Sequence, residues 1–273
     1  MAIGLITAGA ASAIVPAFSL ANAEFRYDPY PVGVARPVFM PSEYDALLDA
    51  WPSTDLFQYR PDLGKKYALS EVNNADGYHR FVGGHPLWWR MYRWVKSREF
   101  VAHVLTTLAG RRVDLGLHAD PVHTTHFFSP WQERFRASFR RRLRRQTGRA
   151  GVLRSRFEFT MMPADGGCIK PHTDHFTKLI TLVVSMARPG EWAPAWGGGT
   201  DVLRPKDISA NFNYLNRQME FAEMDVIDSY AYEPNQCVLF IKTFNSHHSV
   251  RPMTGPPTAL RRTLTINIER VVA

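Results

Sequence analysis

Three residues near the middle of the chain have the types and the spacing of metal ligands. His172, Asp174 and His175 lie in the stretch KPHTDHFTKLITLVVSM (170–186), directly before a β-branched apolar run. In an extended segment residues i and i+2 project to the same side, so His172 and Asp174 can reach one ion together. His175 has the other parity, and we expect it at the rim of such a site or behind it.

A third ligand has to come from elsewhere in the chain. His247 and His248 follow the apolar segment CVLFIKTF (237–244), and either one could complete the set. Two histidines and one carboxylate that leave open positions on the metal form the facial arrangement of non-haem Fe(II) oxygenases. The residues alone therefore predict an iron site and leave the choice between His247 and His248 open.

The order of motifs after residue 154 resembles that of the 2-oxoglutarate and Fe(II)-dependent dioxygenases, in their prolyl-4-hydroxylase-like branch. That family has an H-x-D motif before a strand, a GG-x-T turn, a strand followed by the distal histidine, and a basic residue on the last strand. The matching segments here are PHTDHFTKLITLVVSM (171–186), WGGGTDVL (196–203), PNQCVLFIKTFNSHHSVRPM (234–253) and RRTLTINIE (261–269).

The resemblance implies that Fe(II) is held by His172, Asp174 and His248. The family phrase H-x-V-x-P-[VM] fits from His248 to Met253 and is out of register if it starts at His247. His247 is then expected behind the ligands rather than among them.

The resemblance also implies a cation for the far carboxylate of 2-oxoglutarate. Arg261 and Thr263 match the family's R-x-S motif, with Arg262 as the alternative cation. Neighbouring strand residues face opposite sides, so only one of the two arginines should point inward. Methionines stand where many relatives have a tyrosine that holds 2-oxoglutarate, and we expect Lys178 or Thr160 to replace it.

The implied activity is hydroxylation of a C–H bond in a small molecule or a peptide or protein side chain. O2 and 2-oxoglutarate are consumed, succinate and CO2 are released, and ascorbate is a candidate reductant. One alternative is a non-catalytic jelly-roll protein that binds a metal or another ligand. A nucleic-acid demethylase of the AlkB type is less favoured, because RRTLTINIER (261–270) lacks that group's R-x-N-x-T-x-R signature.

The elements that must position these residues divide the chain into two halves. Helical patterns are predicted over 41–52 with Ser42 as N-cap, over 86–110 with Ser97 capping a second helix, and over 129–148. Strands are predicted at 155–162, 178–186, 200–205, 237–244 and 261–271, and the insertion 206–235 is left unassigned. We therefore expect an α+β protein, and the resemblance specifies a double-stranded β-helix (jelly-roll, cupin-like) core with supporting N-terminal helices.

We expect one domain over 31–273, with helical support over 31–150 and the core over 151–273. We expect residues 1–30 to be an apolar leader, unstructured or signal-like: Ala21-Asn22-Ala23 is typical of a cleavage site, but no basic residue precedes the apolar part. Two cysteines are too few for a disulfide framework. A cytoplasmic protein is the favoured prediction, with export as the alternative.

The basic character of the chain is local. The formal net charge is +8, yet residues 134–156 hold ten arginines and no acidic residue, and outside them 23 basic residues face 25 acidic ones. We interpret the Arg-rich helix predicted over 129–148 as a solvated amphipathic face rather than a nucleic-acid surface, because no aromatic residues interleave its basic face.

A second cluster of possible metal ligands, with His118, Asp120, His123 and His126, lacks the motifs that should follow a metal site. No partner beyond substrate and O2 is indicated, neither nucleic acid nor membrane, and the oligomeric state is not predicted.

Overall fold

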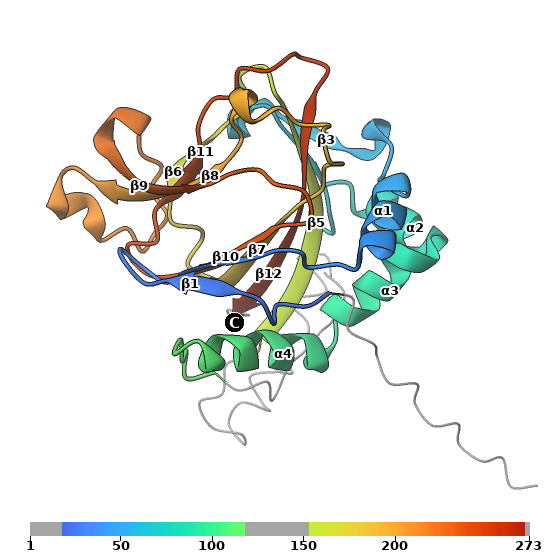
Figure 1. Ribbon diagram of the computed structural model, residues 1–273, viewed down its shortest axis with the longest axis horizontal. Helices are drawn as coiled ribbons and strands as arrows, with labels where there is room; N and C mark the ends of the chain where they lie inside the picture. Colours follow the sequence, from blue (N-terminus) through green and yellow to red (C-terminus); the bar gives the residue numbers. More distant parts are fainter. Residues whose placement is uncertain (1–17, 118–152, 271–273) are drawn as a thin grey trace, which may run out of the picture.

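The computed structural model describes residues 18–117 and 153–270 (Figure 1). The predicted Arg-rich helix and the cluster from His118 to His126 lie outside these residues. Within them the strands form two antiparallel sheets. The eight-stranded sheet has the order β1 (Glu24–Arg26), β2 (Val32–Ala35), β10 (Cys237–Ile241), β7 (Lys178–Ser185), β12 (Leu260–Arg270), β5 (Leu153–Pro163), β4 (Lys66–Leu69) and β3 (Gln58–Arg60). The four-stranded sheet has the order β6 (Ile169–His172), β11 (His248–Val250), β8 (Thr200–Pro205) and β9 (Met224–Tyr230).

Successive strands of the second half alternate between the two sheets. Strands β5 and β7 belong to the large sheet and β6 and β8 to the small one; β9 pairs with β8, and β10, β11 and β12 then alternate again. Strands that are far apart in the sequence therefore become neighbours, as β6 and β11 do in the small sheet. This pairing brings the two predicted ligand segments together.

Four helices lie on the side of the large sheet away from the small one: α1 (Pro41–Asp49), α2 (Ala75–Gly84), α3 (Pro86–Val95) and α4 (Arg98–Gly110) (Figure 1). On β5, Phe157 and Phe159 face these helices, and the ring of Phe159 lies 4.7 Å from that of Trp88. The alternate residues Glu158 and Thr160 therefore face the space between the two sheets. One face of β5 is thus core, and the other lines an interior cavity.

The predicted α+β class is confirmed, as are the long strands at β5, β7, β8, β10 and β12. Ser97 caps α4 as expected and accepts a hydrogen bond from the backbone N–H of Phe100 at 3.1 Å. The predicted cap at Ser42 is wrong: α1 begins at Pro41 behind Met40, which makes no side-chain cap. A proline at the first helical position has no N–H to satisfy, so a side-chain cap is less needed there.

Some elements carry too little local signal to predict. The first half contributes β1 to β4 as well as helices, and β4 extends the large sheet beside β5. Strands β6 and β11 have four and three residues, too few to show a period of two. The unassigned insertion 206–235 contains β9 at the edge of the small sheet.

The described part of the predicted leader packs against the rest of the chain. Phe18, Leu20 and Tyr30 are buried, and β1 pairs with β2. The Tyr30 hydroxyl donates a hydrogen bond to the backbone carbonyl of His247 at 2.6 Å, directly beside the second ligand segment. None of the helices in the described ranges has the length and apolar character that crossing a bilayer requires.

Candidate metal centre

Two adjacent strands place the two histidines side by side. His172 ends β6, His248 begins β11, and the two are partners in the antiparallel pairing of these strands. Their ring centroids lie 4.3 Å apart. Asp174 reaches the same point by a turn rather than by strand parity, because β6 has already ended and Asp174 has a φ of 69°. His172 and Asp174 point to the same site, as expected, but this results from the left-handed backbone conformation of Asp174 and not from the alternation of a strand.

The three side chains direct their donor atoms at one another. One ligand atom from each of His172, Asp174 and His248 lies within 4.8 Å of the others. The Nε2 atom of His172 is 3.7 Å from Oδ1 of Asp174, and the Nε2 atom of His248 is 3.9 Å from Oδ2. The gap between these atoms suits an ion bound by all three.

Each histidine is held in the tautomer that a metal requires. Nδ1 of His172 lies 2.9 Å from the carbonyl oxygen of Lys170, and Nδ1 of His248 lies 2.9 Å from that of Ser246. A carbonyl only accepts hydrogen bonds, so each Nδ1 carries the proton and donates it. The Nε2 lone pairs that face Asp174 are therefore free to bind a cation.

Asp174 is buried but remains ionised. Burial alone would raise its pKa; the ammonium of Lys178, followed by His172 and His248, overcomes this and holds the pKa well below 3.8. Lys178 donates to Oδ1 at 2.7 Å, and the hydroxyl of Thr181 on β7 donates to Oδ2 at 2.9 Å. The carboxylate is thus oriented from two sides.

His248 is kept neutral. Burial, and then the neighbouring His172, lowers the pKa of His248 to about 3. Its ring also stacks on Phe240, with centroids 4.2 Å apart and planes 16° apart. Two imidazoles with free Nε2 atoms and one ionised carboxylate fit a divalent transition metal such as Fe(II), and three protein ligands leave further positions open.

His247 lies outside this group, although it is fully buried. Among the described residues its ring makes no hydrogen bond of good geometry, and the backbone of Ala210 and Asn211 lies close to it. Burial lowers its pKa to about 4. Of the two histidines left open by the residue pattern, the structure brings His248 to His172 and Asp174.

The two candidate arginines face opposite sides of β12. Arg261 is only 3% exposed, donates from Nε to the Gly198 carbonyl at 2.6 Å, and lies over the ring of Tyr232 at 4.9 Å. Among residues 18–117 and 153–270 it has no acidic partner within ion-pair distance, and burial lowers its pKa to about 10. Arg262 instead forms an ion pair with Glu191 on the other side of the strand.

The remaining predicted cosubstrate residues separate into two groups. Thr263 lies on the same face of β12 as Arg261, and its hydroxyl is 2.5 Å from that of Thr160 on β5. Lys178 has its ammonium at Asp174, so it accompanies the metal ligands. Of the two candidates for the missing tyrosine, Thr160 is therefore the one beside Thr263.

The metal-ligand candidates and the inward-facing cosubstrate candidates line one cavity of about 540 Å³. Its wall includes the three metal-ligand candidates together with Thr160, Lys178, His175, Arg261 and Thr263. It also includes an ion pair that the sequence reasoning missed: Lys66 on β4 donates to Glu158 on β5 at 2.8 Å. The sequence did contain a signal for this pair: Glu158 lies between Phe157 and Phe159 on one strand, so it faces the side opposite to the two core phenylalanines.

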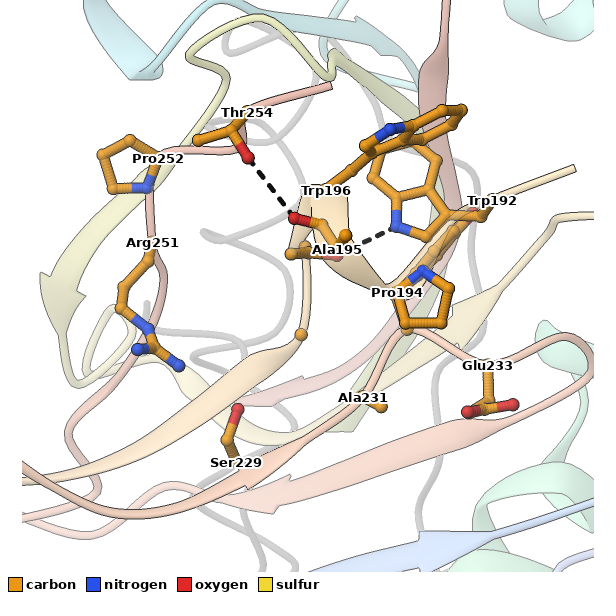
Figure 2. Close-up of a pocket in the computed structure, with 14 residues that line it drawn as sticks. Trp192, Pro194, Ala195, Trp196, Ser229, Ala231, Glu233, Arg251, Pro252 and Thr254 are labelled. Atoms are coloured by element: carbon orange, nitrogen blue, oxygen red, sulfur yellow. Dashed lines mark hydrogen bonds between the residues drawn. The ribbon is translucent and has the colours of Figure 1, made fainter. Parts of the chain in front are cut away.

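A second pocket of about 410 Å³ lies beyond the glycine turn (Figure 2). Trp192 and Trp196 line this pocket together with Pro194 and Arg251, and none of them lines the first cavity. Gly198 and Tyr232, which belong to its wall, are the residues that contact Arg261. Arg261 thus lies between the two spaces.

No family model and no curated protein matches the sequence. Solved structures do resemble the chain. A prolyl-4-hydroxylase from Pseudomonas putida aligns at 14% identity and a TM-score of 0.44, over 92% of this chain and 95% of that one. A structure from a study of prolyl 4-hydroxylases of Phytophthora capsici aligns at 15% identity and 0.49, over 88% and 59%. HygX from Streptomyces hygroscopicus, with nickel and 2-oxoglutarate bound, aligns at 10% identity and 0.47, over 90% and 85%.

Proposed function

We propose that this chain is a 2-oxoglutarate-dependent non-haem Fe(II) oxygenase that hydroxylates a C–H bond of a small molecule or of a peptide or protein side chain. One observation carries the proposal: a single cavity contains both a two-histidine, one-carboxylate group and a buried arginine with no acidic partner in the described ranges. Burying an uncompensated charge is costly. A bound dicarboxylate would supply the missing anion to Arg261.

The chain's own residues divide the work between two ends of the cavity. His172, Asp174 and His248 would hold the iron, with Lys178 and Thr181 orienting the carboxylate. Arg261 would bind the far carboxylate of 2-oxoglutarate in a bidentate manner, with Thr263 beside it. When bound, iron and 2-oxoglutarate would supply the oxidising chemistry, in which one atom of O2 would enter the substrate C–H bond and the other succinate, with release of CO2.

Apolar side chains make up part of the cavity wall. Phe240 covers one side of His248, and Met162 and Val250, which belong to one apolar cluster, also line the cavity. In such surroundings charged contacts are stronger than in water, which favours a fixed cosubstrate.

We further assign strands β5 to β12 to a double-stranded β-helix. Two runs of four strands that alternate between the sheets, joined at the β8–β9 hairpin, support this topology. We assign residues 31–273 to one oxygenase domain, with helical support from its first half, and residues 18–30 pack onto it as an N-terminal extension.

Succinate formation from 2-oxoglutarate tests the proposal. The protein is incubated with Fe(II), 2-oxoglutarate and ascorbate, with and without O2, and metal binding is followed separately by titration of Mn²⁺ with electron paramagnetic resonance. We expect O2-dependent succinate formation in the native protein, and loss of both succinate and tight Mn²⁺ binding in Asp174→Ala. A native protein that binds neither metal nor 2-oxoglutarate would instead support a non-catalytic ligand-binding protein.

A further inference from the structure

A partly buried ion pair lines the same cavity as Arg261, and its carboxylate lies further along the cavity floor than the arginine. Arg261 is paired across the sheet with Met162, and Thr265, four residues further along β12, is paired with Glu158. Four residues of strand span about 13 Å at the usual rise. Thr265 and Glu158 both line the cavity, so its floor extends from the arginine to the carboxylate.

The pair consists of Lys66 and Glu158, with a distance of 2.8 Å between Nζ and Oε1. The two side chains are 22% and 12% exposed. Arg156 approaches the second oxygen of Glu158 at 3.6 Å, and Lys178 acts on the same carboxylate from β7. Burial works against the charged form, but Lys66 and then Arg156 lower the pKa of Glu158 to about 2, so the carboxylate stays ionised.

Stability gives little reason to keep such a pair. Replacing a buried ion pair with apolar residues of similar size is often neutral or stabilising, because taking two charges out of water is expensive. The packing of β5 onto the helices depends on Phe157 and Phe159, which face the other way. Arg156 links Glu158 to Glu269, while the contact of Glu158 with Lys66 lies at the cavity wall, where a ligand can reach it.

We propose that Lys66 and Glu158 form the substrate subsite and that the substrate is a small zwitterion of the α-amino-acid type. Its carboxylate binds the Lys66 ammonium, and its ammonium binds the Glu158 carboxylate. This assignment rests on the proposed function and deepens it by naming the substrate class.

Charge complementarity decides between the classes of substrate. A purely anionic group would be attracted by Lys66 but repelled by Glu158. A purely cationic group would be attracted by Glu158 but repelled by Lys66. In an α-amino acid the two charges are separated by one carbon, which allows both to pair with two protein charges that are themselves in contact. A neutral substrate would remove water from the two charges without forming new charged contacts with them.

The test compares four series of compounds that carry the same side chains: free L-amino acids, their C-terminal amides, N-acetyl amino acids and N-acetyl amides. Each compound is assayed for succinate release above the rate without added compound, and for binding by calorimetry to the Mn²⁺ and 2-oxoglutarate complex without O2. We expect a free amino acid to stimulate and bind. Blocking either end should weaken it roughly 10- to 100-fold, the size of one hydrogen bond between charged groups.

Three variants connect this preference to the pair. Lys66→Met should remove the preference for acid over amide, and Glu158→Gln should remove the preference for free over acetylated amine. Lys65→Met is the matched control, since Lys65 contacts Asp165 outside the cavity, and it should keep both preferences. Thermal unfolding by circular dichroism establishes that each variant is folded.

Several results would overturn the subsite. They are tightest binding by the doubly blocked series, no binding by any free amino acid, or unchanged preferences in folded Lys66→Met and Glu158→Gln. A failure of the proposed function looks different, because the native protein would then form no succinate with or without the probes while calorimetry still ranks the four series.

Discussion

Replacing Arg261 with methionine separates cosubstrate binding from folding. Methionine keeps the length and apolar stem of the side chain but removes the guanidinium. The Nε atom of Arg261 is already engaged by the Gly198 carbonyl, which leaves the two terminal nitrogens for a ligand. We expect Arg261→Met to weaken 2-oxoglutarate binding severely while the protein remains folded.

The magnitude follows from the burial of this arginine. Truncating one partner of a buried, hydrogen-bonded charge pair costs about 2–5 kcal/mol, which raises the KM for 2-oxoglutarate between about 30-fold and several thousand-fold. Without ligand two effects oppose each other. Burial lowers the pKa of Arg261 from 12.5 to about 10, a penalty on the order of 3 kcal/mol that methionine does not bear. Methionine also loses the hydrogen bond to Gly198 and the contact over the Tyr232 ring, so the ligand-free variant should have a stability close to that of the native protein.

Arg262→Met is the matched control on the adjacent residue. Its guanidinium pairs with the half-exposed Glu191 on the other face of β12, so we expect little change in KM and a loss of stability of about 0–1 kcal/mol. The KM is measured by succinate release and the affinity by calorimetry, and urea unfolding gives the stability. An increase in KM in Arg262→Met but not in Arg261→Met would refute the reasoning.

Three further predictions concern the metal ligands and their support. His172→Ala should abolish tight Mn²⁺ binding in a calorimetric titration, whereas His175→Ala, which alters an exposed ring at the rim, should retain it; equal loss in both would contradict the assignment. Thr181→Val removes the hydroxyl that orients Asp174 and should lower Mn²⁺ affinity about 10-fold, and unchanged affinity would show that Lys178 alone suffices. Burial lowers the pKa of His247 to about 4. Below pH 6.5 the histidine is therefore protonated in the unfolded chain but still neutral in the folded protein. The free energy of unfolding of the metal-free protein should then fall by up to about 1.4 kcal/mol per pH unit between pH 6.5 and 4. Urea unfolding at pH 7.5 and 5.0 should show a smaller loss of stability in His247→Phe than in the native protein. Equal losses in the two proteins would contradict this role of His247.

The parts of the fold that could be predicted are those with a long local pattern. Strand β12 has eleven residues with one apolar and one polar face, and β5 is equally long. Such runs reveal the strand and its two faces, whereas the choice of Arg261 with Thr263 came from the resemblance to the family's R-x-S motif. Strand β11 has three residues, so its pairing with β6 could not be inferred from periodicity.

The sequence by itself determined the donor types and the local spacing of His172 with Asp174, and the family resemblance added the phrase that begins at His248 and the pair of Arg261 with Thr263. These are short-range features, set by neighbouring residues on one segment. The tertiary structure decided the rest. The register of β6 against β11 placed His248, rather than His247, beside His172. The backbone turn at Asp174 replaced the expected strand parity. The pairing of β4 with β5 brought Lys66 to Glu158, 92 positions away. The physical reason is that strand register depends on hydrogen bonds and packing between distant segments, and no local pattern records them.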